Sequence, residues 1–437
     1  MNVRILAAFA AVGFLPIFMP DGNAATAQET LTREMAIERI LAATPALDAL
    51  RNNVEAHQAA IRQAGFKPNP FLTAETENFT GTGPFTGLGR SEITFTYSQR
   101  FERGGKRQSR MRAAQTGKKI AVTQWHINRL DIIRAAEQAY IAVLVAQANL
   151  DNLQRQAKIF ADIHSVIEKR MARGKDSRLA VQSAKLRLSA AQNQVAKAER
   201  TAANARRSLA SLWQMPDAMF TINTDVLFDL PKSLKVAEKS VAESGPDLEY
   251  WKLQQERSTN LLAVEKANAV QDPTFKVGVR YLQGTSDVAA VAGVSIPFAL
   301  YNTNAGNISK AKASRRKSQH DLLEAERQLE RHILLQQNAR AAAYVQAKEI
   351  LEDLIPEALL TEQLVVERLE QGVASYLDVF AAQTLSAELQ NQLITELEHY
   401  QLAEAELNRL TAKYADDDGL DATSTDEGAA LQDSEGN

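Results

Sequence analysis

The chain has 437 residues, a formal net charge of −3 and no cysteine. The near-neutral charge argues against a nucleic-acid partner. Without cysteine the chain has no disulfides, no thiolate metal site and no cysteine-linked lipid anchor. The chain has only 12 prolines and 20 glycines, few for this length, so we expect long continuous helices.

The first 27 residues have the pattern of a secretory signal peptide. Arg4 supplies a positive start, Ile5–Phe18 is an apolar run too short to span a bilayer, and Ala25–Ala27 fits an A-x-A cleavage site. The alternative, a membrane anchor helix, is disfavoured by two prolines in and just after the apolar run. We therefore expect a cleaved signal and a non-lipidated mature chain that starts at Gln28.

A short helical segment and a pair of strands follow. Residues 32–65 predict a helical segment in which Thr44 is placed as an N-cap before Pro45. Two strand-like runs come next, Phe71–Phe79 and Ser91–Phe101. In the second run the large apolar residues take every second position, which indicates one apolar and one polar face. This alternation suits either a soluble sheet or a membrane barrel.

Long helices dominate the next hundred residues. A helix over residues 103–171 would be about 100 Å long at 1.5 Å per residue. Gly174 and Ser177 then predict a left-handed helix end followed by a new N-cap. The return helix, residues 177–213, carries apolar residues spaced three and four apart, a coiled-coil seam built largely of alanine. The seam residues are Ala180, Ala184, Leu188, Ala191, Val195, Ala198, Ala202, Ala205, Leu209 and Leu212.

The second half of the chain repeats the first. Asp272-Pro273 echoes Asn69-Pro70, and Gly372–Val379 echoes Gly174–Val181, a period of roughly two hundred residues that indicates a duplicated half-molecule. The second half comprises a helix, a strand pair at 274–298, a long helix at 304–371 and a last helix at 376–413. Pro356 predicts a kink or break in this second long helix. The chain then divides into a signal peptide (1–27), a first repeat (28–230, with its strand pair at 71–101), a second repeat (231–414) and an acidic tail (415–437), which we expect to be disordered.

The strand pairs can be weighed as membrane elements. Their length suits a tilted strand that crosses a bilayer. Four strands cannot close a membrane barrel, which needs at least about eight, so a membrane interpretation demands oligomerisation. Three copies would supply twelve strands around a water-filled interior, whereas two copies would form a barrel filled by side chains. On this hypothesis Glu75 and Glu77 face the pore, although both residues also suit the solvent-exposed face of an ordinary sheet. A small soluble sheet that caps a helical rod is the alternative.

Particular residues carry a resemblance to a known family. Asn69–Leu72 at the entry to the first strand, Gln99–Arg107 at the exit from the second, the order of elements and the duplication together resemble TolC-like outer-membrane efflux proteins. The Glu-x-Gly-Gly-Lys-Arg form of Glu102–Arg107 is similar to the branch that serves heavy-metal efflux pumps of the cobalt-zinc-cadmium type. The resemblance extends over about Leu31–Ala415.

The resemblance implies a fold and a set of partners. Such proteins are homotrimers in the outer membrane of Gram-negative bacteria, mainly α-helical, with a twelve-stranded β-barrel to which each protomer contributes four strands. Long antiparallel coiled-coil helices form an α-barrel tunnel in the periplasm. A periplasmic adaptor, also called a membrane fusion protein, couples this duct to an inner-membrane pump. For the metal branch the implied pump is the proton-driven resistance-nodulation-division type.

The resemblance also assigns roles to residues of the two helix turns and of the strand-to-helix joint. Asp378 matches an aspartate that lines the aperture, where three copies would form an acidic ring that attracts cations. Capping of a helix start is the alternative role for Asp378. The glycine pair that leaves the first strand pair is interpreted as the joint between barrel and tunnel. The joint comprises Gly104 and Gly105, and the residues expected to contact the adaptor are Gly174, Ser177, Leu179, Gly372, Ser375 and Leu377.

The sequence departs from the family pattern at the aperture. Ala374 and Ala381 stand where charged latch partners often occur in the family, so a salt-bridge lock of the usual type is not expected here. Lys175, Asp176 and Arg178 on the other hairpin are candidates to replace it.

No other chemistry is indicated. The six histidines have no spacing typical of a metal site. No nucleophile–base arrangement is visible, so we expect neither an enzyme nor a cofactor. The hypothesis is a passive trimeric export duct, with heavy-metal cations as cargo. Drugs, other small organic molecules or a secretion substrate are alternative cargoes, and a periplasmic coiled-coil structural or adaptor protein is the alternative class. The histidines are His57, His126, His164, His320, His332 and His399.

Overall fold

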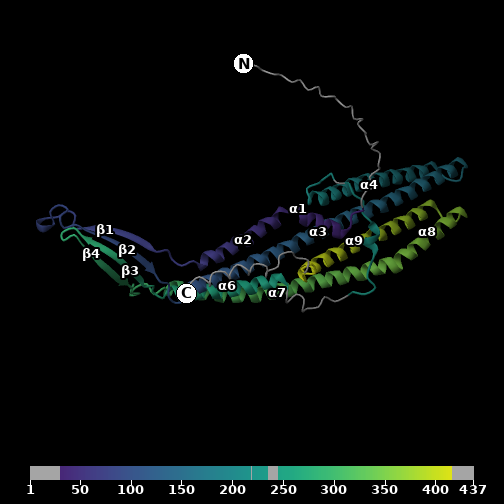
Figure 1. Cartoon of the computed structure of the whole chain (residues 1–437). Coiled ribbons are helices and arrows are strands. Elements are labelled where there is room, and N and C mark those ends of the chain that lie inside the picture. The colour runs from purple at the N-terminus through teal and green to yellow at the C-terminus, as the bar shows by residue number, and fades with distance from the viewer. Residues whose placement is uncertain (1–29, 218, 235–244, 416–437) are drawn as a thin grey trace, which may run out of the picture.

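The computed structural model describes residues 30–217, 219–234 and 245–415. The molecule is long, with a β-sheet at one end and the turns of two helical hairpins at the other (Figure 1). The expected signal peptide lies outside the described residues, as does the acidic tail after Ala415. The mainly α-helical, duplicated fold expected from the sequence is confirmed.

The described part of the first half contains four α-helices, which range from 11 to 67 residues, and two strands. Thr32 caps α1, because its hydroxyl accepts a hydrogen bond from the Met35 N–H at 3.3 Å. Thr44 separates α1 from α2, but its hydroxyl donates to the Ile40 carbonyl oxygen and does not cap α2. The elements are α1 (Arg33–Ala43), α2 (Pro45–Gly65), β1 (Phe71–Glu77), β2 (Glu92–Arg100), α3 (Lys106–Ala172) and α4 (Arg178–Ser211), with short 3₁₀ turns at Gly83–Phe85 and Thr224–Phe228.

Within the described residues, the second half repeats the order of helix, strand pair, long helix and return helix. The long helix is not continuous, because a π-helix at Ile350–Leu354 interrupts it directly before Pro356. Proline has no N–H to donate within a helix, and a π turn accommodates the missing bond. The elements are α6 (Pro246–Asn268), β3 (Thr274–Leu282), β4 (Asp287–Ser295), α7 (Ala305–Glu349), α8 (Ile355–Glu370) and α9 (Tyr376–Leu410).

The four strands form one antiparallel sheet in the order β1-β2-β3-β4. The two strand pairs meet where β2 pairs with β3, for example at Phe95 opposite Val279. In the first pair Glu75 lies opposite Thr94, and in the second Val277 lies opposite Ala292. The strand pairs of the two halves therefore lie side by side in a single sheet.

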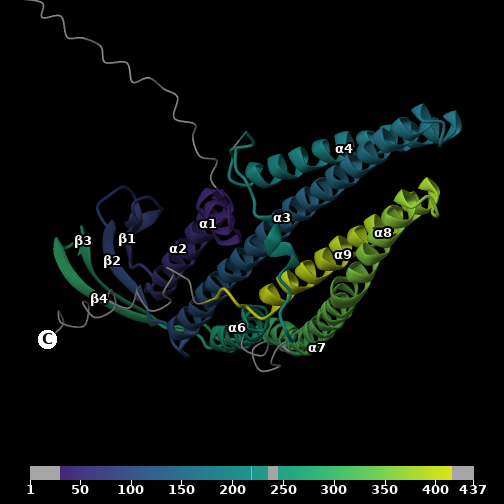
Figure 2. The ribbon, with the colours of Figure 1, turned by 90° about the vertical axis from the view of Figure 1, so that its right-hand side faces the viewer.

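Helix α3 runs through the centre of the helical part and packs against α1, α2, α4, α6 and α9 (Figure 2). Where α1 crosses α3, a core cluster contains Leu31, Tyr140, Leu144 and Trp213. The small residues of the predicted seam let α3 and α4 approach closely. The fully buried seam residues are Ala180, Ala184, Ala191, Ala202 and Leu209.

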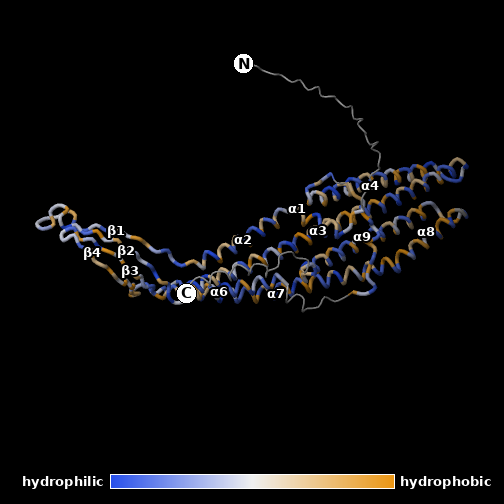
Figure 3. Tube along the Cα trace, viewed as in Figure 1, coloured by the Kyte–Doolittle hydropathy of each residue, from blue (hydrophilic) through white to orange (hydrophobic). Residues whose placement is uncertain are grey.

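Polar and apolar residues alternate along the long helices (Figure 3). Among the residues that the structure describes, no helix combines the length and the apolar character required to cross a membrane.

Candidate functional site

The sheet has an apolar face that is exposed. Ile93, Phe95 and Tyr97 of β2 lie on this face beside the large residues of β3, and Phe95 is 51% exposed. On the opposite face of the same strand, Thr94 is only 2% exposed. This distribution is the reverse of a soluble sheet, which buries its apolar face. The other large exposed residues on the apolar face are Leu72, Phe275, Val277, Val279, Tyr281, Val288 and Val294.

The polar face is held together by one arginine. Arg280 of β3 forms ion pairs with Glu92 at 2.8 Å and with Glu77 at 3.1 Å, and it donates to the Thr94 hydroxyl at 2.9 Å. Glu77 and Glu92 lie opposite each other on neighbouring strands, where two like charges repel. Arg280 offsets this repulsion. Both predicted pore-facing residues, Glu75 and Glu77, lie on this polar face.

The joint between β2 and α3 depends on two glycines in the left-handed region. Gly104 has φ +69°, and a Cβ there would lie 2.7 Å from the Val270 side chain. Gly105 has φ +72° and precedes the first residue of α3. A side chain at Gly104 would therefore be excluded both by backbone conformation and by space.

Sequence reasoning missed two residues that fix the joints. Asp272 of the second half accepts hydrogen bonds from the Arg103 N–H at 2.9 Å and from Lys106 Nζ at 2.7 Å. Asn304 begins α7 with φ 61°, as Gly105 begins α3, and its amide donates to Glu265 at 2.8 Å. Asparagine tolerates the left-handed region of backbone conformation better than most residues. The position of Asn304 in the second repeat, which matches that of Gly105 in the first, is the sequence signal that could have identified it.

The two hairpin turns share one geometry. At the end of α3 the Lys175 N–H donates to the Arg170 carbonyl oxygen at 2.9 Å, and at the end of α8 the Val373 N–H donates to Arg368 at 3.0 Å. Gly174 and Gly372 take φ values of +70° and +79°. Each turn therefore ends its helix with the same glycine-based motif.

The helix starts beyond these turns are capped by serine. The Ser177 hydroxyl accepts from the Ala180 N–H at 3.2 Å, and the Ser375 hydroxyl accepts from the Asp378 N–H at 3.3 Å. Near these caps two apolar side chains extend into solvent, Leu179 at 73% exposure and Leu377 at 53%. All six residues expected to contact the adaptor therefore lie at or within a few positions of the two turns.

Asp378 is an exposed member of a capping box. Its carboxylate accepts hydrogen bonds from the Ser375 N–H and hydroxyl, both at 2.8 Å. These bonds, the backbone bond foremost, lower the pKa of Asp378 below its usual value. The carboxylate therefore caps α9, the alternative role considered for it, and it is held ionised. In the other turn Asp176 pairs with Arg170 of its own hairpin at 2.7 Å.

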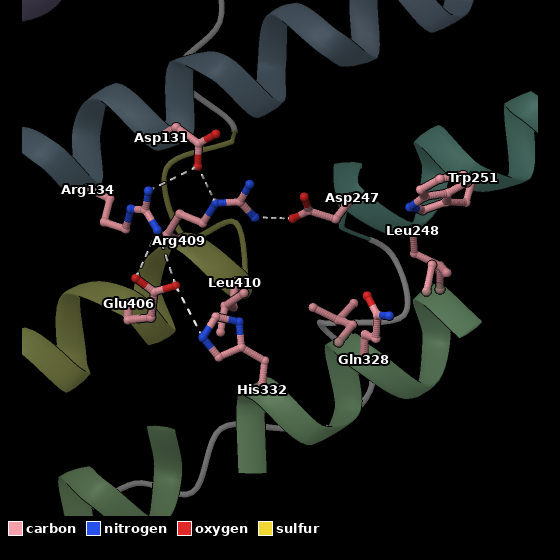
Figure 4. A pocket seen from close by; sticks show the side chains of 12 residues that line it. Asp131, Arg134, Asp247, Leu248, Trp251, Gln328, His332, Glu406, Arg409 and Leu410 are labelled. Carbon is pink, nitrogen blue, oxygen red and sulfur yellow. Dashed lines mark hydrogen bonds and ion pairs between the residues drawn. The ribbon is translucent and has the colours of Figure 1, made fainter. Parts of the chain in front are cut away.

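A charged cavity of about 280 Å³ lies where α3, α6, α7 and α9 meet (Figure 4). Arg409 of α9 bonds to Asp131 of α3 at 2.7 Å and to Asp247 of α6. Burial alone would lower the pKa of Arg409, but the bonds to both aspartates outweigh it and raise the pKa. Glu406 pairs with Arg134 at 3.2 Å. The paired charges make the cavity a structural junction between the two halves.

Metal-ligating side chains do not converge in the part of the chain that the structure describes: no group of three or more His, Cys, Asp or Glu is arranged to hold an ion there. His332 lies 3.6 Å from Glu406 at the cavity, but Glu406 already pairs with Arg134.

Comparisons with known proteins agree with this geometry. The sequence profile described as "Outer membrane efflux protein" matches residues 36–213. The chain is 26% identical over 356 residues to the cobalt-zinc-cadmium resistance protein CzcC of Cupriavidus metallidurans, covering 81% of this chain and 83% of that protein. It is 28% identical over 284 residues to the nickel and cobalt resistance protein CnrC of the same organism, covering 63% and 65%.

The fold is also that of a solved outer-membrane protein. VceC of Vibrio cholerae superimposes with a TM-score of 0.71 at 19% sequence identity, over 87% of this chain and 95% of that one. The resemblance noted in the sequence, the exposed apolar sheet and the profile match agree. The chain is thus similar to outer membrane efflux proteins, whose family model matches residues 36–213.

Proposed function

We propose that this chain is the outer-membrane exit duct of a tripartite efflux system. In this role it is a passive channel and not an enzyme, and substrate reaches it from an inner-membrane pump through a periplasmic adaptor. The observation that carries the proposal is the reversed sheet, in which Phe95 is exposed and Thr94 is buried. Lipid would cover the apolar face, and water would fill the space beside the polar face.

The sheet needs partner copies to exist in a membrane. Within the described residues β1 and β4 each pair along one edge only. Unpaired backbone groups in lipid cost several kcal/mol each, so these edges must pair with other copies. Three copies would give twelve strands and a water-filled interior, which supports a homotrimer.

The proposed cargo is heavy-metal cations. CzcC and CnrC are resistance proteins for cobalt, zinc, cadmium and nickel by name. Carboxylates on the polar face, Glu75 and Glu77, and the ionised Asp378 near the opposite end would attract cations along the path. Glu75 and Glu77 are thus proposed to face the pore, and Asp378 to border the aperture.

The resemblance to the family and the signal-like segment support the pump, the location and the adaptor contact. A pump of the proton-driven resistance-nodulation-division type would supply energy and selectivity. The segment 1–27 would direct a non-lipidated chain to the outer membrane, and the helices would extend into the periplasm. Turn residues Gly174–Leu179 and Gly372–Leu377 would meet the adaptor.

Growth of a deletion strain tests the cargo. We expect the strain to become sensitive to cobalt, zinc, cadmium or nickel salts and to keep its resistance to a panel of drugs. Return of the gene should restore metal resistance. If drug sensitivity alone changed, the metal assignment would be wrong, while the duct itself would stand.

The adaptor contact can be tested at one turn. Gly372→Glu or Leu377→Glu should abolish efflux while the amount of protein in the outer membrane stays unchanged. Gly372 needs its left-handed φ, whereas Leu377 is exposed and follows the cap, so Leu377→Glu separates contact from backbone strain. Full efflux by Leu377→Glu would contradict the contact.

A further inference from the structure

One aromatic side chain joins the turn ends of the two hairpins within a protomer. Phe380, in the second turn of α9, is 1% exposed and packs among Ile167, Ala180 and Ala184 of the other hairpin. Its ring lies 5.5 Å from that of Phe160 on α3, edge to face. A ring from the second hairpin thus packs against the small seam residues Ala180 and Ala184 and against α3 of the first hairpin.

An arginine covers this ring from the first hairpin. The Arg187 guanidinium of α4 lies 4.8 Å from the centroid of Phe380, within the distance of a cation–π contact. Tyr376 lies edge-on to the same ring at 6.2 Å. A second link is weaker: Arg170 of α3 donates to the Leu369 carbonyl oxygen of α8 at 3.5 Å.

Helix α8 of the second hairpin is largely exposed. Among the described side chains of α8, Ala358 alone is buried. The π-helix at Ile350–Leu354 breaks the continuity of α8 with α7, and such breaks often mark places where a helix bends. Farther from the turn, Asn391 of α9 bonds to Asn152 of α3 at 3.0 Å. Between that bond and the turn, Phe380 is a fully buried α9 side chain that packs in the core cluster of the first hairpin.

We propose that Phe380 and Arg187 are positioning residues that set the separation of the two hairpins, and so the width of the aperture that Asp378 borders. Asp378 lies two residues before Phe380 in the same helix, so the ring and the carboxylate move together. The inference rests on the proposed function, because only a channel has an aperture to be set. The contact that holds the aperture narrow is then made by an aromatic ring and a cation of the same protomer.

Conductance of purified trimers in planar lipid bilayers tests the proposal, since the narrowest point limits ion flow. Arg187→Met keeps the aliphatic stem and removes the charge. It should raise the ratio of wide to narrow conductance states by about threefold to tenfold, as expected for loss of a cation–π contact. Phe380→Ala should raise it further, because packing is lost as well. Arg187→Lys keeps a cation and should restore most of the wild-type behaviour.

Arg206→Met is the matched control. Arg206 lies on the same helix, far from the turn, and bonds to Gln147 of α3. It should leave conductance unchanged. Equal conductance of wild type, Arg187→Met and Phe380→Ala would overturn the proposal, and so would an equal effect of Arg206→Met. If wild-type trimers did not conduct at all, the proposed function itself would fail. If Phe380→Ala does not fold, the conductance of Arg187→Met, Arg187→Lys and Arg206→Met still tests the proposal.

Discussion

At the scale of single residues, Gly278 is the position where the sheet has no room for a side chain. A Cβ there would lie 2.3 Å from the Phe95 carbonyl oxygen and 3.0 Å from the Thr96 Cα. Both atoms belong to the backbone of the neighbouring strand and cannot move aside. Gly293, on the adjacent strand, would have no atom within 4 Å of its Cβ.

Gly278→Ala should therefore destabilise the sheet by about 1–3 kcal/mol, the usual cost of overpacking. Gly293→Ala, the matched control, should have little effect. The midpoint of thermal unfolding of the purified oligomer measures both. Equal midpoints for the two variants would contradict the close approach of β2 and β3.

Glu137 of α3 is a carboxyl group buried at 1% exposure. Arg33 lies 3.7 Å away, and the Tyr414 hydroxyl donates to the carboxylate at 3.1 Å. Burial raises the pKa of Glu137 above its ordinary 4.5 even though both partners lower it. Burial and the nearby Glu137 also raise the pKa of Tyr414 to about 12. The end of α9 and the start of α1 are thus tied to α3 at a group that resists ionisation.

The sign of the pH effect follows from this shift. Because the folded chain binds a proton at Glu137 more tightly than the unfolded chain, stability should fall as pH rises from about 4.5 through the raised pKa. Glu137→Gln should reduce this slope. Glu324→Gln serves as the control, since the pKa of that exposed carboxyl is lowered instead. Thermal midpoints across pH 4–8 check the prediction, which a slope unchanged in Glu137→Gln would refute.

At the scale of elements, local patterns predicted the helices and their ends well. The seam at Ala180, Ala184 and Ala191 is buried, and Gly174 and Gly372 are left-handed, as their residue types indicate. The π-helix before Pro356 could not be predicted in kind, because proline specifies only that a bond is missing. Thr44 is the N-cap residue of α2 before Pro45, as predicted, but its hydroxyl donates to the Ile40 carbonyl oxygen and makes no side-chain cap.

The junction of α3, α6 and α9 depends on Arg409, whose side chain is 10% exposed. Arg409→Met should cost about 2–4 kcal/mol, because it leaves Asp131 and Asp247 without their shared cation; the cost is moderated by the partial exposure of both carboxylates.

Arg331→Met removes an exposed pair with Glu324, which water and salt screen, and should leave the thermal midpoint nearly unchanged. The difference between the two thermal midpoints is the measurement. A similar small loss in both variants would mean that Arg409 does not tie the halves together.

At the scale of the whole molecule, the sequence predicted the duplication and the strand pairs but left the environment of the sheet open. Alternation along Ile93, Phe95 and Tyr97 suits a soluble or a membrane sheet, and only the three-dimensional structure shows the apolar face exposed. Contacts that join distant segments, such as Arg409 with Asp247 or Arg187 with Phe380, have no local signature. They depend on how the hairpins pack, which a single sequence does not reveal.

The central claim is that the reversed sheet is completed by other copies in the outer membrane. Membrane fractionation, followed by sizing in mild detergent with and without heating, tests it most directly. We expect protein in the outer-membrane fraction, at about three times the protomer mass before heating and at the protomer mass after it. Recovery of the mature chain as a monomer in the soluble periplasm would contradict the account.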